Sequence, residues 1–207
     1  MDDQQINPLE IPTVEYYDES IYDLKLESLD GEDNIFEKNK GKVTMLVNVT
    51  GECANSPQYV TIQNLYDKYK DLGFEVVAVP STDFCDHAYG EFKNSNASPE
   101  LMRSHMKDLY KTDLPFAKMA AIVEDSETGL PVHPFYQKVQ DNKDPIQGNF
   151  EKFIISKDGK KVVRYCNSDL LDLAYNSGNR TINSETALKS ITETIEHFLG
   201  ESDIIVE

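Results

Sequence analysis

Short apolar runs alternate along this chain with apolar residues at helical spacing, and this alternation predicts a sheet flanked by helices. Residues 43–49 are apolar at nearly every position, which is typical of a strand covered on both faces. Helical spacing follows over residues 59–69, with Ser56 as a capping residue and Pro57 as the first helical position. Residues 74–79 form a second apolar run. The order strand, helix, strand predicts a right-handed crossover between two parallel strands.

Weaker signals predict five further elements. Serine residues mark helix starts, and Asp-Gly pairs mark turns between antiparallel strands. The elements are a short hairpin over residues 20–36, a helix that Ser98 and Pro99 begin, a strand over 119–123, an antiparallel hairpin of 150–156 and 161–166 around Asp158-Gly159, and a helix from near Ser184 to Gly200. Their order predicts an α/β protein of the thioredoxin-like fold class, with a mixed central sheet and helices on both faces.

The length and composition predict one domain with a flanking segment at each end. A chain of 207 residues with 39% hydrophobic residues is long enough for one well-buried core. We expect this domain to occupy residues 20–200, followed by a short C-terminal tail over 201–207. Residues 1–19 form an acidic arm without Lys or Arg. Disorder or loose wrapping over the surface is the expectation for the arm, and docking to a partner is the alternative.

The charge balance narrows the possible partners. The chain has 37 acidic and 20 basic residues and a net charge of −17, which repels phosphate backbones and argues against nucleic acid. Neither a basic and apolar leader nor an apolar run long enough to span a bilayer is present, so we expect a cytoplasmic protein without a membrane partner. The three cysteines and four histidines lack the spacing of a disulfide framework or a metal site. We therefore expect no metal and no bound cofactor.

Cys53 lies between the first predicted strand and the following helix. Unpaired N–H groups at a helix start favour the thiolate and lower the thiol pKa, whereas burial among apolar groups raises it. The loop that carries Cys53 and the loop over residues 80–86 both leave the carboxyl ends of parallel strands, where α/β sheets form their sites. The second loop contains Asp83 and Cys85. We therefore expect these residues to lie near Cys53.

Several short motifs occur in an order and spacing similar to those of the glutathione peroxidase family. The resemblance extends from Ser20 to about Leu199. Its first group is Gly41-Lys42-Val43, Val47-Asn48-Val49, Glu52-Cys53, Gln58-Tyr59 and Leu65-Tyr66-Asp67-Lys68-Tyr69, ending at Phe84, and its second group is Asn149-Phe150-Glu151-Lys152-Phe153, Asp158-Gly159-Lys160 and Arg164-Tyr165.

The resemblance implies a chemistry for Cys53. In this family a cysteine or selenocysteine at that position attacks a peroxide oxygen, and a thiol such as glutathione or a thioredoxin-like protein restores it. A glutamine, a tryptophan N–H and an asparagine amide support the attack. Asn149 matches the asparagine, but Asp83 stands at the glutamine position and Gly148 at the tryptophan position. An ionised Asp83, like Glu52, would raise the Cys53 pKa, whereas a protonated Asp83 could donate to the leaving oxygen.

Cys85 stands where the family usually has glycine, and two interpretations are open. It could resolve oxidised Cys53 by forming a disulfide with it, or it could be a half-buried loop thiol. Residues 88–113 replace a glycine-rich stretch of the family, so we expect the rim of the site to be remodelled.

Two functions therefore remain open. The first is a thiol peroxidase of weakened activity that reduces hydrogen peroxide or organic hydroperoxides. The second is a non-catalytic thioredoxin-fold module that binds a protein partner through its acidic surface, its N-terminal arm or residues 88–113.

Overall fold

The predicted strand, helix and strand are present and form the parallel part of a five-stranded sheet. The computed structural model describes residues 12–31, 34–126, 128–141, 143–171 and 182–201. In the sheet order β1-β5-β4-β2-β3, β2 and β3 are parallel and every other neighbouring pair is antiparallel. The strands are β1 (Val14–Tyr16), β2 (Val43–Val49), β3 (Phe74–Pro80), β4 (Lys152–Ile155) and β5 (Lys161–Tyr165). The predicted mixed sheet of the thioredoxin-like class is confirmed.

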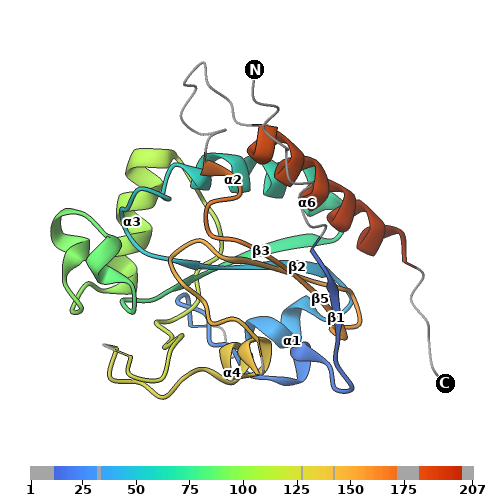
Figure 1. The fold of residues 1–207 in the computed structure, drawn as a ribbon, viewed down its shortest axis with the longest axis horizontal. Coiled ribbons are helices and arrows are strands. Elements are labelled where there is room, and N and C mark those ends of the chain that lie inside the picture. Colours follow the sequence, from blue (N-terminus) through green and yellow to red (C-terminus); the bar gives the residue numbers. More distant parts are fainter. Residues whose placement is uncertain (1–11, 32–33, 127, 142, 172–181, 202–207) are drawn as a thin grey trace, which may run out of the picture.

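Helices cover both faces of this sheet (Figure 1). α2 (Gln58–Tyr69), α3 (Pro99–Tyr110) and α6 (Ile182–Gly200) lie on one side, and α1 (Ile35–Asn39) and α4 (Pro134–Gln140) lie on the other. Each face has its own apolar cluster, because successive side chains of β2 point to opposite faces. Met45 packs in the cluster under α2, and Leu46 packs in the cluster under α4. This double burial explains why the β2 sequence is a continuous apolar run.

The predicted hairpin over residues 20–36 is wrong, because polar side chains cap short helices there. The Ser20 hydroxyl accepts a hydrogen bond from the Tyr22 N–H and begins the 3₁₀ helix η1 (Ile21–Asp23). The Asn34 side-chain oxygen Oδ1 accepts from the Phe36 N–H, and α1 begins there. Ile21, one of the apolar residues that suggested alternation, therefore lies in a helical turn instead of a strand.

The predicted strand over residues 119–123 is also wrong. Only isolated bridges form near it, including one between Ala121 and Val132. The N–H groups of Ile122 and Val123 donate to the Asp83 carboxylate instead of to a neighbouring strand. A side chain thus takes the place of a strand partner.

Part of the predicted acidic arm lies in the sheet. Residues 14–16 form β1, which pairs with β5 along the edge of the sheet. Residues 1–11 and 202–207 lie outside the described residues, so most of the predicted arm and tail does too. For residues 14–16, the expectation of disorder or loose wrapping is wrong because their backbone completes the edge ladder.

Other predictions hold. Ser98 caps α3, the Asp158-Gly159 turn joins β4 and β5, and α6 ends at Gly200 as expected. Ser56 does not cap α2, because its hydroxyl bonds within the Cys53 loop and Pro57 precedes a helix that begins at Gln58. α4 was not predicted.

Candidate functional site

Cys53 lies in the loop between β2 and α2, at the carboxyl edge of the parallel strands as predicted. Its side chain is only 4% exposed. The backbone N–H of Cys53 donates to the Ser56 hydroxyl oxygen at 2.8 Å, and that hydroxyl lies 3.7 Å from the sulfur. An isolated antiparallel bridge joins Cys53 to Ala88 in the segment after β3. The thiol is thus enclosed between its own loop and the segment that follows β3.

The environment of Cys53 raises its thiol pKa. Burial is the largest cause, and the charge of Glu52 adds to it. Hydrogen bonds from Ser56 and from the backbone of Asn55 and Ser56 act in the opposite direction and stabilise the thiolate. The net result contradicts the idea that the helix start lowers this pKa, because burial outweighs the nearby donors. The predicted effect of Glu52 is confirmed.

Tyr59 is a buried neighbour of the thiol. Its hydroxyl donates to the backbone carbonyl of Thr50 at 3.2 Å, and its ring meets Phe150 edge-on with centroids 4.9 Å apart. Burial raises the pKa of the Tyr59 phenol well above its usual range, and the charge on Cys53 raises it further. Tyr59 therefore forms part of the apolar wall beside the sulfur rather than a charged group.

Asn149 connects the two loops that carry the candidate cysteines. Its buried amide N–H donates to the Phe84 carbonyl at 3.3 Å, beside Cys85, and its backbone carbonyl accepts from Asn55 Nδ2 at 3.1 Å, near Cys53. The Asn149 side-chain oxygen is buried and has no partner among the described residues. Asn149 is therefore placed at the junction of both loops and retains an unused acceptor.

The segment that presents Asn149 is attached to β2 by one side chain. Asn48 Nδ2 donates to the carbonyl of Gly148 at 2.9 Å, and Asn48 Oδ1 accepts from the N–H of Glu151 at 2.9 Å. These two bonds span Asn149 on both sides. The backbone around Asn149 is thereby fixed to the strand that leads to Cys53.

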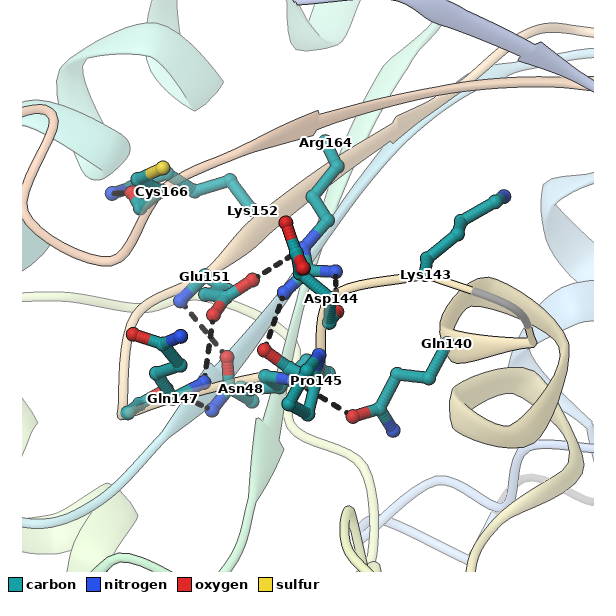
Figure 2. Close-up of polar contacts among 12 residues, drawn as sticks. Asn48, Gln140, Lys143, Asp144, Pro145, Gln147, Glu151, Lys152, Arg164 and Cys166 are labelled. Carbon is teal, nitrogen blue, oxygen red and sulfur yellow. Dashed lines mark hydrogen bonds and ion pairs between the residues drawn. The ribbon is translucent and has the colours of Figure 1, made fainter.

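A partly buried ion pair reinforces the same segment. Figure 2 shows Arg164 between Glu151 and the backbone of Asp144 and Pro145. Arg164 Nε donates to Glu151 Oε2 at 2.6 Å, and the other guanidinium nitrogens donate to the carbonyls of Asp144 and Pro145 at 2.6 and 3.1 Å. Glu151 Oε1 accepts from the N–H of Gln147 at 3.0 Å. The pair therefore orders the approach to Asn149.

Gly148 leaves room for a side chain from elsewhere. A Cβ atom at this position would lie 2.6 Å from Asn167 Nδ2. The carbonyl of Asn167 in turn accepts from Gln58 Nε2 at 2.7 Å. Asn167 thus fills the space that a larger residue at 148 would need, and the tryptophan expected by resemblance does not fit without its displacement.

Asp83 makes its side-chain hydrogen bonds with residues 122–126. Its carboxylate accepts from the N–H groups of Ile122 and Val123 at 2.5 and 3.2 Å and from the Ser126 hydroxyl. The carboxylate that raises the Cys53 pKa is Glu52. The geometry gives Asp83 a role in holding residues 122–126.

Cys85 begins the 3₁₀ helix η3 (Cys85–His87) and is buried, 4% exposed. Its carbonyl accepts from the N–H of Ala88, the residue that pairs with Cys53. The two loops therefore meet, although no disulfide joins Cys53 and Cys85 in this structure. Cys166 is exposed after β5.

Four buried polar atoms at this edge have no hydrogen-bond partner among the described residues. They belong to residues that follow β2 or β3, begin α2, or precede β4. The atoms are Thr50 Oγ1, Thr82 Oγ1, Gln58 Oε1 and Asn149 Oδ1. Buried polar groups are rarely left unpaired, so these atoms are the polar groups at this edge that retain unused hydrogen-bonding capacity.

Sequence reasoning missed Ser56 as a partner of the sulfur. The available signal was the spacing of three residues after Cys53, which suits a side-chain bond back to the loop. Within the described ranges, no group of three or more His, Cys, Asp or Glu side chains could hold a metal ion. None of the helices described there is both long and apolar enough to cross a membrane.

Comparisons with known proteins agree with this geometry. The glutathione peroxidase family model matches residues 21–138. The chain is 33% identical over 146 residues to the glutathione peroxidase-like peroxiredoxin gpx1 of Schizosaccharomyces pombe, a match that covers 70% of this chain and 87% of that protein. A chloroplastic phospholipid hydroperoxide glutathione peroxidase 1 of Arabidopsis thaliana is 30% identical over 154 residues, 72% of this chain, and the chain spans only 60% of its length. The crystal structure of T. cruzi GPX1 superposes with a TM-score of 0.60 at 23% identity, covering 90% of this chain and 100% of that one, which shows a shared fold.

Proposed function

Because the chain belongs to the glutathione peroxidase family, we propose that it reduces hydroperoxides with Cys53 as the nucleophile. The thiolate of Cys53 attacks one peroxide oxygen, so that an S–O bond forms while the O–O bond breaks. The sulfur is oxidised to a sulfenic acid, and the leaving oxygen takes up a proton to become water or an alcohol. Two thiols of a reductant then restore Cys53 and release water and a disulfide.

The observation that carries this proposal is the hydrogen bond from the Ser56 hydroxyl to the Cys53 sulfur at 3.7 Å. A donor directed at sulfur favours the charged form that performs the attack. Thr50, Thr82 and Asn149 at the same edge each retain a polar atom without a partner among the described residues, and hydroxyl and amide oxygens are groups that can bond to a peroxide.

We propose that this peroxidase is slow. Asp83 directs its carboxylate to residues 122–126, and Gly148 has no side chain, so neither position supplies a donor to the sulfur. Loss of one preorganised donor typically costs about a hundredfold or more in rate. Asp83 would act as a proton donor only after releasing its present partners, and we assign it the positioning role instead.

We propose that Cys85 is the resolving thiol and that the reductant is glutathione or a thioredoxin-like protein. The meeting of the two loops at the pair Cys53 and Ala88 supports this assignment, because Cys85 lies three residues before Ala88. A disulfide requires Cα atoms within about 7 Å. Three cysteines without a disulfide suit a reducing compartment such as the cytoplasm.

One observation favours the alternative of a non-catalytic binding module. Cys53 is almost fully buried and its thiol pKa is raised, which are properties of an inert structural cysteine. In that case the acidic surface or residues 88–113 would serve protein binding.

Peroxide consumption in the presence of glutathione, or of thioredoxin with its reductase, tests the proposal. The peroxidase requires turnover that Cys53→Ser abolishes and that the matched control Cys166→Ser leaves unchanged. Cys85→Ser should abolish turnover with the thioredoxin system if Cys85 resolves Cys53. Equal background rates for the wild type and Cys53→Ser would instead support the binding module.

A further inference from the structure

Residues 88–110, the cap segment, lie over the loop that carries Cys53. The segment contains η4 (Gly90–Lys93) and α3 and forms the green part at the left of Figure 1. Ala88 pairs with Cys53, the N–H of Tyr89 donates to the carbonyl of Glu52 at 2.7 Å, and His105 Nε2 lies 2.9 Å from Glu52 Oε2. Three contacts thus hold the cap segment on the nucleophile loop.

The closest fit within this contact involves Gly51 and Phe92. A Cβ atom at Gly51 would lie 2.0 to 2.3 Å from three ring atoms of Phe92, far inside van der Waals contact. The ring of Phe92 is 2% exposed and lies 4.7 Å from the His105 ring, centroid to centroid. Glycine is required at 51 for space, because the aromatic ring occupies the place of a side chain.

The ring therefore closes the apolar side of the candidate site. Cys53, Ala88 and Phe92 belong to one buried cluster together with Met102 and Met106 of α3. Each of the first three is less than 5% exposed. The cap segment therefore covers the sulfur on the side where Phe92 lies against the nucleophile loop.

We propose that Phe92 is a specificity-determining residue that restricts Cys53 to hydrogen peroxide and other small oxidants and excludes bulky organic hydroperoxides. This inference rests on the proposed peroxidase function for its substrate class. The chemical step is the one described above, with hydroxide as the leaving group that is protonated to water.

Access to Cys53 provides a test that does not need turnover. Wild type and Phe92→Ala are treated with iodoacetamide and with a bulky maleimide, and labelling of the Cys53 peptide is followed by mass spectrometry. Phe92→Ala should increase the rate ratio of the bulky to the small reagent by about tenfold or more, because a hydrophobic contact removed from a pocket changes discrimination by this order. Tyr89→Ala, which truncates a half-exposed aromatic ring of the same segment, should leave the ratio unchanged. An unchanged ratio in Phe92→Ala overturns the inference.

The activity assay separates this inference from the peroxidase proposal. Relative turnover of cumene hydroperoxide to hydrogen peroxide should rise in Phe92→Ala by a similar factor. If bulky labelling increases but no variant consumes peroxide, the access control by Phe92 stands and the peroxidase proposal fails. If turnover exists and its ratio is unchanged, the inference fails alone.

Two further variants guard against simple misfolding. Phe92→Leu keeps an apolar side chain and should increase the labelling ratio less than Phe92→Ala, with thermal unfolding close to wild type. Gly51→Ala should displace the Phe92 ring and increase the labelling ratio. Gly51→Ala in the Phe92→Ala variant should increase the labelling ratio little further, because the ring with which the new methyl group collides is already absent. Additive effects of the two substitutions would contradict the close fit between positions 51 and 92.

Discussion

The hydroxyl of Ser56 accepts a hydrogen bond from the backbone N–H of Cys53 and lies 3.7 Å from its sulfur. One side chain thus fixes the shape of the nucleophile loop and offers a donor to the thiolate. Burial and Glu52 act against the thiolate. The reactivity of Cys53 depends on the balance between these groups.

Ser56→Ala should raise the Cys53 thiol pKa and slow its reaction with iodoacetamide at pH 7 by about tenfold, as expected for loss of a hydrogen bond to a charged group. It should also lower the free energy of unfolding by about 1–3 kcal/mol, because the buried N–H of Cys53 loses its acceptor. Ser56→Thr keeps the hydroxyl and serves as the control. Equal alkylation rates for Ser56→Ala and wild type would show that the hydroxyl does not act on the sulfur.

Glu52→Gln should lower the Cys53 thiol pKa, because it removes the carboxylate whose charge opposes the thiolate. The measurement is the pH dependence of Cys53 alkylation. Glu100→Gln makes the same change of charge on α3 and should leave the profile in place. A Cys53 pKa that stays constant or rises in Glu52→Gln would contradict an effect of the Glu52 charge on the sulfur.

Asp83→Asn should destabilise the protein by about 1–3 kcal/mol, because an amide cannot accept all the bonds that residues 122–126 donate to the carboxylate. Thermal or denaturant unfolding measures this loss. The oxidation rate of Cys53 in the folded variant should equal that of wild type. Lost oxidation with unchanged stability would instead identify Asp83 as the proton donor.

The buried Lys152 should make the protein more stable as the pH rises above 7. Burial lowers its pKa to about 7, although Nζ donates to the carbonyls of Cys166 and Asn167 at 2.9 and 3.4 Å. In the unfolded chain a lysine titrates near 10.4, so between about pH 7 and 10 the unfolded state binds more protons than the folded state. The free energy of unfolding therefore rises with pH across this window, by up to about 1.4 kcal/mol per unit, and falls as the pH is lowered.

Lys152→Met removes this contribution. From pH 7 to pH 10 the free energy of unfolding of wild type should rise relative to that of Lys152→Met. Denaturant titrations at several pH values measure it, and taking the difference cancels the contributions of buried tyrosines and cysteines, whose raised pKa values act in the opposite sense. A constant difference would contradict the lowered pKa.

β2, β3, β4 and β5, the parallel pairing of β2 with β3 and the antiparallel pairing of β4 with β5 follow from the sequence. Burial on both faces leaves continuous apolar runs such as residues 43–49, whereas the position of β1 at the edge of the sheet leaves no such run. Segments whose backbone N–H groups donate hydrogen bonds to side chains could not be predicted from apolar runs. Asn34 and Asp83 each bind backbone N–H groups of a distant or flanking segment, and their acceptors replace strand partners. The spacing of apolar residues along the chain does not reveal such side-chain to backbone hydrogen bonds.

The candidate site was predictable in its position but not in its chemistry. The strand ends place Cys53, Asp83 and Cys85 at one edge, as the sequence predicts, and Asn149 reaches the same edge from the segment before β4. The direction of a carboxylate such as that of Asp83 depends on which N–H groups the fold brings near it. Cys53 is buried in the same cluster as Phe92, whose ring lies against Gly51, and these two residues are far apart in the sequence.

The most direct test is the site of oxidation after the reduced protein meets one equivalent of hydrogen peroxide at pH 7. Intact-mass and peptide mass spectrometry should find the first product at Cys53, as a sulfenic acid or as a disulfide with Cys85, while exposed Cys166 remains reduced. Oxidation that begins at Cys166, or that proceeds equally at all three cysteines, would contradict Cys53 as the reactive nucleophile.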